Sequence, residues 1–571
     1  MKCRFRLRYA AMTSAFGSPA VFWLVVVLGV VCAWFLTAQK LQPSDDAYIT
    51  FRHVRNLLEH GRPAWNLSGD PVLGTTTPAF MLTLALFCRV LWLDRVDQAA
   101  LYLNAVFQFL SVLLSYLIAR DLFRRTVPAI LFALLIGFNS VSAYISSQGF
   151  ESTMLTAAVL GGLYFVRAGR VSLGLVLASV APLIRPEGIL LTPLLWGHIL
   201  LKRRFKKRLL FAYLTVPLAW LAVSAAYYGS PIPHAIQAKK RFPSIYKPYT
   251  GNDVRLLPRL PGALHQAVGL WEDPAGTLVL TGSASREFET TVGRWRRWIL
   301  SLGLPLALIC AIARPDGAML YWLYAPLFLL LYGWIGHTQP WYFPSFVVFS
   351  ILLLFGGWVC AIDLALSRLT RRNDGRIPWW RGLRFGATLL VFLALMTVNN
   401  YSANTGQYDH AHRGPIFPRN PWGSLWNLWE VQRYGYYRKA AEFLNSQTTG
   451  DAVVLMSEVG VFGYFYPGDV IDTVGLCSPE ALAFYPPPEW DIRDSQGRYY
   501  TKANNFTPTE MVMALKPDYV VNSRFYLFNL FRRGSFFPEE YEEISRFGRV
   551  WGQPLLVFRR RCDTSSSSPP A

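Results

Sequence analysis

Two adjacent acids, Asp45 and Asp46, are the residues of this 571-residue chain whose type and position best suit chemistry. They follow the apolar segment 20–38, which can cross a bilayer as one helix, because about 20 helical residues match the hydrocarbon core. A carboxylate pair at the membrane–water boundary could act as a general base or bind a cation. It could also mark no more than the end of a helix in water. The surrounding residues decide between these interpretations.

Composition indicates a membrane protein. Hydrophobic residues make up 53% of the chain and charged residues 16%, which is typical of a polytopic membrane protein and not of a soluble enzyme. A net charge of +21 would suggest a nucleic-acid partner in a soluble chain. Here the basic residues gather in short runs between apolar segments, at 120–125, 202–208 and 368–376, as in cytoplasmic loops that face anionic lipid. We therefore predict membrane lipids, and no nucleic acid, as partners.

The order of apolar and basic segments predicts the topology. Basic residues precede the first span, which predicts a cytoplasmic N-terminus over 1–19 and places the acids outside. If every later apolar window crossed, the runs 120–125 and 202–208 would lie outside as well. We therefore predict about eleven crossings plus one juxtamembrane or re-entrant helix at 76–93, where Pro78 suits a broken entry. The other windows are 99–119, 127–146, 151–167, 171–185, 188–201, 208–228, 298–313, 318–335, 343–364 and 383–399.

The polar segments predict the domain organisation. The predicted parts after the N-terminus are a membrane module over 20–400 with outer loops 39–75 and 229–296, an extracytoplasmic domain over 401–561 and a disordered tail over 562–571. Within that domain the predicted elements are a helix at 437–447 and strands at 451–456, 516–522 and 554–558. The alternation of helix and strand predicts a small α/β domain on the same side of the membrane as the acids.

Residues 47–60 are predicted to form an amphipathic helix on the membrane surface. Arg52 and Arg55 lie on its polar face, at the depth of a lipid phosphate, and arginine binds phosphate bidentately. We therefore predict both as phosphate ligands. The alternative is an ordinary interfacial helix with snorkelling arginines.

Three ionisable residues stand at the ends of apolar segments: Glu151, Arg185 and Glu187. Charges so close to hydrocarbon are costly unless they are paired or functional. They could belong to a site, or an Arg185–Glu187 or Arg185–Glu151 ion pair could hold helices together.

A second polar group lies beside aromatic rings. His337 precedes Trp341 and Tyr342, a combination that suits the faces of a sugar. Aromatic residues at an interface are also the ordinary membrane belt. We predict these three residues as substrate contacts, with the belt as the alternative.

Several strings between Ala20 and Phe558 carry a family resemblance. In chain order they are DDAYITFRHVRNLLEHGRPAWN, GTTTPAF, GFEST, LIRPEG, YYGSPIPHAIQAK, SEVGVFGYFYPGDVIDTVGLCSPE and LKPDYVV. Their order and spacing resemble the GT-C superfamily of polyprenyl-phosphate-sugar-dependent glycosyltransferases. Within it the chain is most similar to the bacterial terminal arabinofuranosyltransferase group and its uncharacterised homologues.

The resemblance implies a GT-C fold in a bacterial inner membrane, with the general base at Asp45 or Asp46. Arg185 and Glu187 match the Arg-Pro-Glu-Gly turn of the family, and Glu151 matches a Gly-Met-Glu-like turn in which Phe replaces the usual Met. It implies Arg185 as a donor contact and both glutamates as substrate contacts. No cofactor is required by this pattern, and a divalent cation at the acid pair stays open.

The implied reaction moves a sugar, with a pentofuranose as the precedent, from a polyprenyl-phosphate donor to an extracytoplasmic glycan or lipid acceptor. No nucleotide sugar is available outside the cytoplasm, so an activated sugar must arrive on a lipid. A carboxylate that takes the acceptor proton during in-line attack predicts inversion in a single displacement. The alternatives are a transporter or flippase of a lipid-linked sugar, which would favour broken helices and repeated halves, and a non-catalytic envelope scaffold.

Overall fold

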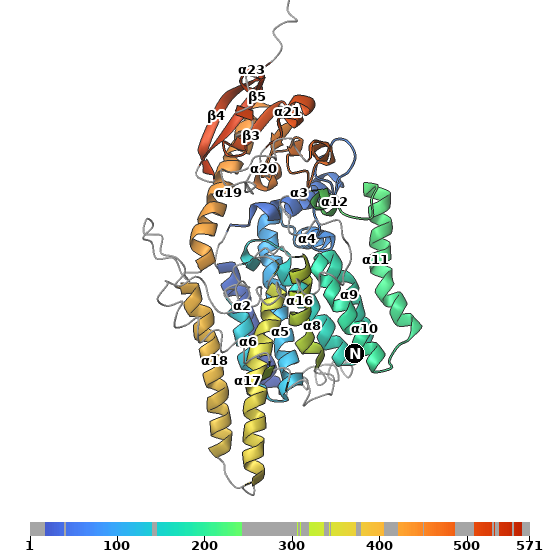
Figure 1. Cartoon of the computed structure of the whole chain (residues 1–571), viewed down its shortest axis with the longest axis vertical. Coiled ribbons are helices and arrows are strands. Elements are labelled where there is room, and N and C mark those ends of the chain that lie inside the picture. The colour runs from blue at the N-terminus through green and yellow to red at the C-terminus, as the bar shows by residue number, and fades with distance from the viewer. Residues whose placement is uncertain are drawn as a thin grey trace, which may run out of the picture. The chain divides into compact units, whose positions relative to one another are not determined.

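The computed structural model describes most of the chain (Figure 1). The described residues are 18–38, 42–139, 145–241, 305–306, 309, 319–335, 342, 344–372, 379–404, 421–448, 450–485, 507–527, 530–531, 536–550 and 553–561. Residues 1–17 of the predicted N-terminus, residues 242–296 of the second outer loop and the predicted tail lie outside the described residues.

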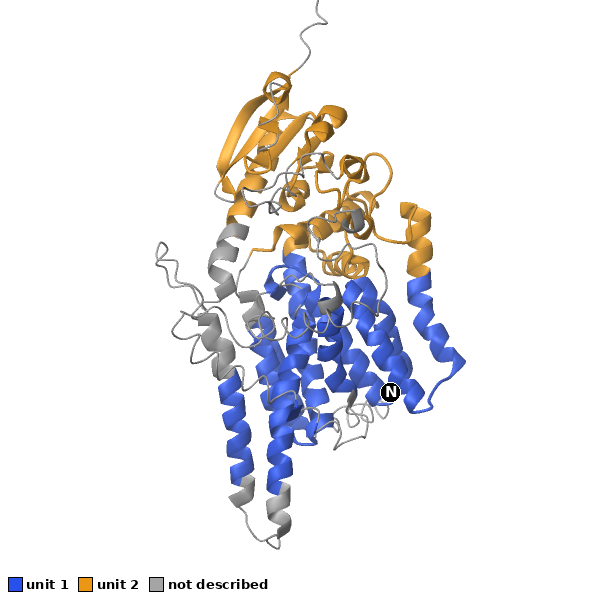
Figure 2. Cartoon of the chain, viewed as in Figure 1, with its two compact units in different colours: residues 1–41, 98–218, 254–425 blue, residues 42–97, 219–253, 426–571 orange. Residues whose placement is uncertain are grey.

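The chain divides into two compact units, each made of three separate segments (Figure 2). Unit 1 comprises residues 1–41, 98–218 and 254–425, and unit 2 comprises residues 42–97, 219–253 and 426–571. The segment with the acid pair therefore belongs to the same unit as the C-terminal part of the chain. The sequence analysis instead predicted the segment 39–75, which contains the acid pair, as an outer loop of the membrane module.

The described part of unit 1 is helical. Its elements are α2 (Pro19–Ala38), α5 (Val96–Phe123), α6 (Thr126–Gly137), α8 (Ser152–Arg167), α9 (Val171–Ile184), η1 (Pro186–Leu190), α10 (Leu191–Leu201), most of α11 (Lys207–Tyr228), α16 (Met319–Ile335), α17 (Pro344–Arg372) and α18 (Trp379–Asn404). Among the described residues, three helical segments are long and apolar enough to cross a membrane, namely Val96–Phe123, Lys207–Tyr228 and Pro344–Leu366, and shorter apolar helices accompany them. Large apolar side chains such as Trp34, Phe211 and Leu390 are exposed on these helices, as expected where hydrocarbon is the solvent.

Small residues let the helices of unit 1 approach closely. A Cβ at Gly174 of α9 would lie 2.8 Å from the Gly162 carbonyl oxygen of α8 and 2.5 Å from the Val166 side chain. Membrane helices use such small residues because close backbone contact supplies the packing energy that the hydrophobic effect cannot supply in lipid. Glu151 directly precedes α8 and Arg185 directly follows α9, so this helix pair positions both residues.

Unit 2 contains a five-stranded mixed sheet with strand order β2-β1-β3-β5-β4. Its strands are β1 (Val454–Met456), β2 (Val470–Asp472), β3 (Tyr519–Ser523), β4 (Tyr541–Val550) and β5 (Gln553–Arg560). The β1 strand pairs in parallel with β2 and β3, whereas β5 pairs antiparallel with β3 and β4. Strands β1, β3 and β5 overlap the three predicted strands. Strand β2 was missed because it is only three residues long, and β4 because its polar, half-exposed residues hide the alternation.

The helices of unit 2 come from all three of its segments. They are α3 (Asp45–His60), α4 (Pro78–Leu91), α12 (His234–Arg241), the larger part of α19 (Pro421–Gln447), α20 (Gly460–Phe465), η4 (Pro479–Phe484), α21 (Thr509–Leu515) and α23 (Phe536–Glu540). Backbone contacts join the segments: the His234 amide donates to the Leu73 carbonyl at 3.2 Å, and the His234 imidazole lies 2.9 Å from the Gly475 carbonyl. The α4 helix has 14 residues, or about 21 Å at 1.5 Å per residue, which is less than the thickness of a hydrocarbon core.

Candidate active site

The two acids at the start of α3 have different environments. Asp45 is buried, with 2% of its surface exposed, whereas the next residue, Asp46, is exposed. Both lie in the first turn of the helix, where the positive end of the helix dipole favours carboxylates. The sequence left open which acid reaches a substrate. In this structure, of the two, only Asp46 presents its side chain to the surroundings.

Asp45 is bound to the start of α20. Its carboxylate accepts hydrogen bonds from the amides of Gly460 at 3.3 Å and Val461 at 2.8 Å. The guanidinium of Arg433 on α19 lies 3.8 Å from Asp45 Oδ2. Burial nevertheless raises the pKa of Asp45 to about 7, because desolvation of the charged form outweighs the favourable effect of Arg433. Asp45 therefore anchors the beginning of α3 to the C-terminal segment of unit 2.

The glycine that opens α20 is required by its close contact with Asp45. A Cβ at Gly460 would lie 1.8 Å from the carbonyl oxygen of Asp45, so no other residue fits without a backbone shift. A Cβ at Gly463 would lie 2.7 Å from the Trp65 ring. The glycines in the string SEVGVFGYF thus serve the packing of α20 against α3 and the residues that follow it.

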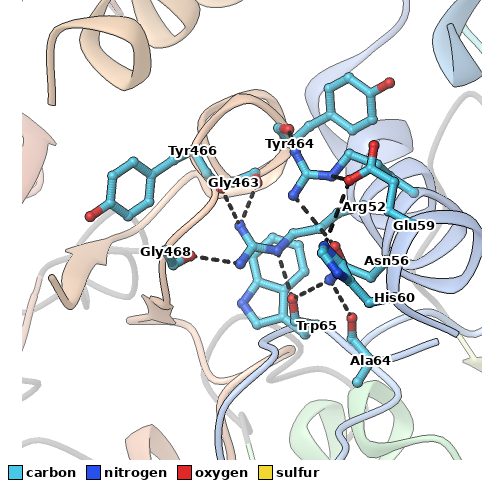
Figure 3. Close-up of polar contacts among 11 residues, drawn as sticks. Arg52, Asn56, Glu59, His60, Ala64, Trp65, Gly463, Tyr464, Tyr466 and Gly468 are labelled. Carbon is cyan, nitrogen blue, oxygen red and sulfur yellow. Dashed lines mark hydrogen bonds and ion pairs between the residues drawn. The ribbon is translucent and has the colours of Figure 1, made fainter. Parts of the chain in front are cut away.

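Arg52 does not lie on an exposed polar face of α3, and the prediction that it does is wrong. It is fully buried, and its guanidinium lies 4.6 Å from the centre of the Trp65 ring (Figure 3). All five of its N–H groups have acceptors: the carbonyls of Trp65 (2.6 Å), Gly463, Tyr466 (3.2 Å) and Gly468 (2.8 Å) and the Asn66 side chain (3.2 Å). No N–H of Arg52 is left to bind a phosphate, so its role is to join α3 to the segment around α20.

The amphipathic interpretation of α3 failed because both of its faces are covered. The apolar residues Phe51 and Val54 of α3 are buried, but its polar residue Asn56 is also fully buried. Its amide donates to the Ala64 carbonyl at 2.9 Å (Figure 3). Periodicity identifies the polar positions of a helix, but it does not show whether their side chains form hydrogen bonds with water or with backbone carbonyls.

Arg55 is largely occupied as well. It donates to the carbonyl of Tyr464, lies 5.5 Å from the centre of that ring, and pairs with Glu59 at 3.8 Å. Its side chain keeps 17% of its surface exposed. Of the two arginines predicted on this helix, Arg55 is therefore the one that still has an accessible edge.

Residues that the sequence analysis did not select complete the surroundings of Asp45. Glu458 accepts from Arg433 at 3.0 Å, from the Tyr526 hydroxyl at 3.1 Å and from the Tyr437 hydroxyl. Glu458 stands two residues beyond the end of β1, at the carboxyl edge of the parallel strands. That edge is where open α/β sheets place ligands and functional groups. An acid directly after the predicted strand 451–456 was the signal that could have found it.

Three ionisable residues of unit 1, Glu151, Arg185 and Glu187, form a compact cluster. Arg185 donates to Glu187 at 2.5 Å and to Glu151, and all three side chains are at least nine-tenths buried. The guanidinium also lies 4.8 Å from the centre of the Tyr342 ring. Both ion pairs that the sequence offered as the alternative interpretation are thus present. The formal charge of the cluster is −1, so it suits hydroxyl groups better than a second anion.

The turn that holds Arg185 follows from its sequence. Pro182 lies within the last turn of α9, which ends at Ile184, and Pro186 opens η1. A Cβ at Gly188 would lie 2.3 Å from backbone atoms of Ala181. The Arg-Pro-Glu-Gly string is therefore a tight reversal that aims Arg185 and Glu187 at each other. His337 and Trp341, the other predicted substrate contacts, lie outside the described residues.

A cation shared by the acid pair does not fit this arrangement. Asp45 already accepts two amide hydrogen bonds and faces the positive charge of Arg433, which would repel a cation. Within the described part of the chain, no group of three or more His, Cys, Asp or Glu side chains is placed to hold a metal ion.

Comparison with known structures identifies the fold. The chain is similar to ArnT from Cupriavidus metallidurans bound to undecaprenyl phosphate, with a TM-score of 0.52 and 12% identity over 97% of this chain and 100% of that one. This protein has an ArnT-like fold. The apo state of the same protein aligns with a TM-score of 0.49 and 14% identity over 95% and 98% of the two chains. The likeness to ArnT extends over nearly the whole chain, and it concerns the fold.

Two further comparisons concern the sequence. Residues 426–566 match a family described as a domain of unknown function (DUF8728). No curated protein matches the chain significantly. The family match covers β1 to β5 and the residues Arg433 and Glu458. The residues that bind the side chain of Asp45 therefore lie within this sequence family, whereas Asp45 itself lies outside the match.

Proposed function

We propose that this protein is a membrane glycosyltransferase that moves a sugar from a polyprenyl-phosphate donor to an extracytoplasmic glycan or lipid acceptor. The ArnT-like fold over nearly the whole chain supports this class. The ArnT structure holds undecaprenyl phosphate, which supports a polyprenyl-phosphate lipid as the partner here. A pentofuranose is the sugar that we expect, on the strength of the sequence resemblance.

The observation that carries the proposal is the unequal pair at the start of α3. Asp45 is buried and held by two backbone amides, while its neighbour Asp46 is exposed on the fixed first turn. A general base must reach the proton that it removes, and it must be held in place. We therefore assign the base to Asp46 and the anchoring role to Asp45.

The proposed chemistry is one displacement. The carboxylate of Asp46 takes the proton of an acceptor hydroxyl while the hydroxyl oxygen forms a bond to the anomeric carbon of the donor. The bond from that carbon to the phosphate oxygen breaks, and the polyprenyl phosphate leaves with the electron pair. Attack from the face opposite the leaving group inverts the anomeric centre.

The predicted donor and substrate contacts need revision in this proposal. Arg52 is withdrawn because its N–H groups are all occupied, and Arg55 is kept as the phosphate contact of α3. In unit 1 we propose that Glu151 and Glu187 accept hydroxyl groups of the sugar, and that Arg185 orients them instead of binding phosphate. The predicted sugar-facing residues His337, Trp341 and Tyr342 stay as proposed, and of these Tyr342 lies against Arg185.

The test is donor turnover by the full-length protein in nanodiscs, with a panel of polyprenyl-phosphate sugars. We expect one donor to turn over and Asp46→Asn to lower kcat by about 10²-fold or more without a change in thermal unfolding. Asp70→Asn, an exposed acid of the same segment, is the matched control and should keep full activity. If no donor turns over but a labelled lipid-linked sugar crosses the bilayer of proteoliposomes, the protein is a transporter and the proposal is wrong.

A further inference from the structure

A buried chain of charges leads from the acid pair to the sheet of unit 2. Arg433 on α19 lies between two carboxylates: its Nη2 is 3.0 Å from Glu458 Oε1 and 3.8 Å from Asp45 Oδ2. The side chains of Arg433 and Glu458 are 10% and 13% exposed, and that of Asp45 is 3% exposed. Asp45 and Glu458 therefore interact through one shared arginine in a low-dielectric environment, where such interactions are strong.

Glu458 is held by side chains, whereas Asp45 is held mainly by backbone amides. Besides Arg433, the hydroxyls of Tyr437 and Tyr526 donate to Glu458, and these tyrosines come from α19 and from the residues after β3. Three donors, two from α19 and one from the residues after β3, fix this carboxylate in space. Arg433 is drawn toward this fixed charge, which determines how near it comes to Asp45.

We propose that Glu458 is a positioning residue of the transfer reaction: by holding Arg433 it sets the place and the electrostatic environment of Asp45, and through it the orientation of Asp46. This inference rests on the proposed function. It makes the string SEVG of the C-terminal segment part of the catalytic unit, because this string supplies both Glu458 and the amide of Gly460 that binds Asp45.

The electrostatic consequence has a definite sign. The groups that face Asp45 are Asp46 on its own helix, Arg433 and Tyr437 on α19, Glu458 after β1 and Tyr526 after β3. Glu458 raises the pKa of Asp45, whereas Arg433 lowers it. Replacing Glu458 by Gln removes one negative charge and releases Arg433 toward Asp45. Asp45 should then stay ionised to lower pH.

The first experiment needs no activity. Thermal unfolding of the full-length protein in detergent is recorded from pH 4 to 9 for the native sequence, Asp45→Asn, Glu458→Gln and the double variant. The difference between each protein and its Asp45→Asn counterpart reports the titration of Asp45. We expect this titration to move to lower pH in the Glu458→Gln background. Glu442→Gln is the control, because Glu442 lies exposed on α19, the helix that carries Arg433, and pairs there with Arg438.

The second experiment uses the donor that the native protein turns over. We expect Glu458→Gln to lower kcat by about tenfold to a hundredfold, to leave KM little changed and to move the acid limb of the kcat profile to lower pH. If Glu458→Gln does not fold, Arg433→Lys takes its place and should instead move the titration of Asp45 to higher pH, since a lysine cannot serve both carboxylates in the same way.

The outcomes separate the two proposals. An unmoved Asp45 titration in the Glu458→Gln background overturns the positioning role, whether or not the protein is active. A moved titration together with no turnover of any donor by the native protein overturns the proposed function and leaves the coupling of Glu458 to Asp45 established. A kcat loss equal to that of Glu442→Gln, with unchanged pH dependence, also overturns the positioning role.

Discussion

The carbonyl oxygen of Asp45 lies so close to Gly460 that a Cβ at position 460 would be only 1.8 Å from it. The Asp45 carboxylate binds the Gly460 amide at 3.3 Å in the same contact. Two residues 415 positions apart thus meet through both backbone and side chain. This contact ties the first turn of α3, and with it Asp46, to the sheet-bearing segment of unit 2.

The first prediction is that Gly460→Ala is strongly destabilising. A methyl group at this position must displace the backbone of α3 or of α20, and overpacking of this kind costs about 1–3 kcal/mol or more. We expect a lower temperature of thermal unfolding and loss of donor turnover together. Gly435→Ala is the matched control: Gly435 lies in α19 with nothing within 4 Å of an added Cβ. There, alanine should stabilise the helix by up to about 1 kcal/mol. Equal stability of the two variants would contradict the contact.

The second prediction concerns Arg52→Lys. A lysine keeps the charge but offers three donors in place of five, so at least two of the buried acceptors around Arg52 lose their hydrogen bonds. Each loss costs about 1–3 kcal/mol, and we expect a clear drop in the temperature of thermal unfolding. Arg546→Lys on the exposed part of β4 should have almost no effect. A raised KM for the donor with unchanged stability would instead return Arg52 to a phosphate-binding role.

The third prediction is a pH dependence of stability that belongs to Asp45. Its pKa rises from the ordinary value of 3.8 to about 7 on folding, so between these values the folded state holds a proton that the unfolded state has lost. The free energy of unfolding contributed by this group therefore falls as pH rises from about 4 to about 7 and is constant above. The difference between the native protein and Asp45→Asn in thermal unfolding should follow that course.

Other groups titrate nearby, and the difference removes them. The pKa of Asp472 is raised by burial to about 6 and adds to the same trend, whereas burial lowers the pKa of His53 to about 4 and acts in the opposite direction. Both residues are present in the native protein and in Asp45→Asn, so their contributions cancel. A difference that does not vary between pH 4 and 7 would show that Asp45 keeps an ordinary pKa.

The fourth prediction tests the turn of unit 1. Gly188→Ala would bring a methyl group within 2.3 Å of the Ala181 backbone, so the turn must open and the Arg185–Glu187 pair at 2.5 Å must separate. We expect a loss of stability of about 1–3 kcal/mol or more, measured by thermal unfolding in detergent. Gly197→Ala in α10, where an added Cβ meets nothing within 4 Å, should be neutral or stabilising.

Local patterns were sufficient for several features of this protein. The hydrophobic composition and the basic runs predicted a polytopic membrane protein, and the described part of the chain has three helices long and apolar enough to cross a membrane. Three strands of the sheet were found because their apolar residues are contiguous and bounded by turn residues. The Arg-Pro-Glu-Gly string indicated a tight turn, because proline and glycine restrict the backbone at the places where the helix ends.

Long-range contacts decided the rest. The sequence determined that two acids stand together after the first apolar segment, but the contact with Gly460 and Val461 decided that Asp45 is buried. It determined that α3 carries polar residues on one face, but the carbonyls around Gly463 and Gly468 decided that Arg52 faces protein. Burial and pKa depend on which distant segment covers a residue. The pattern of neighbours along the chain carries no information about that segment, and only the tertiary structure supplies it.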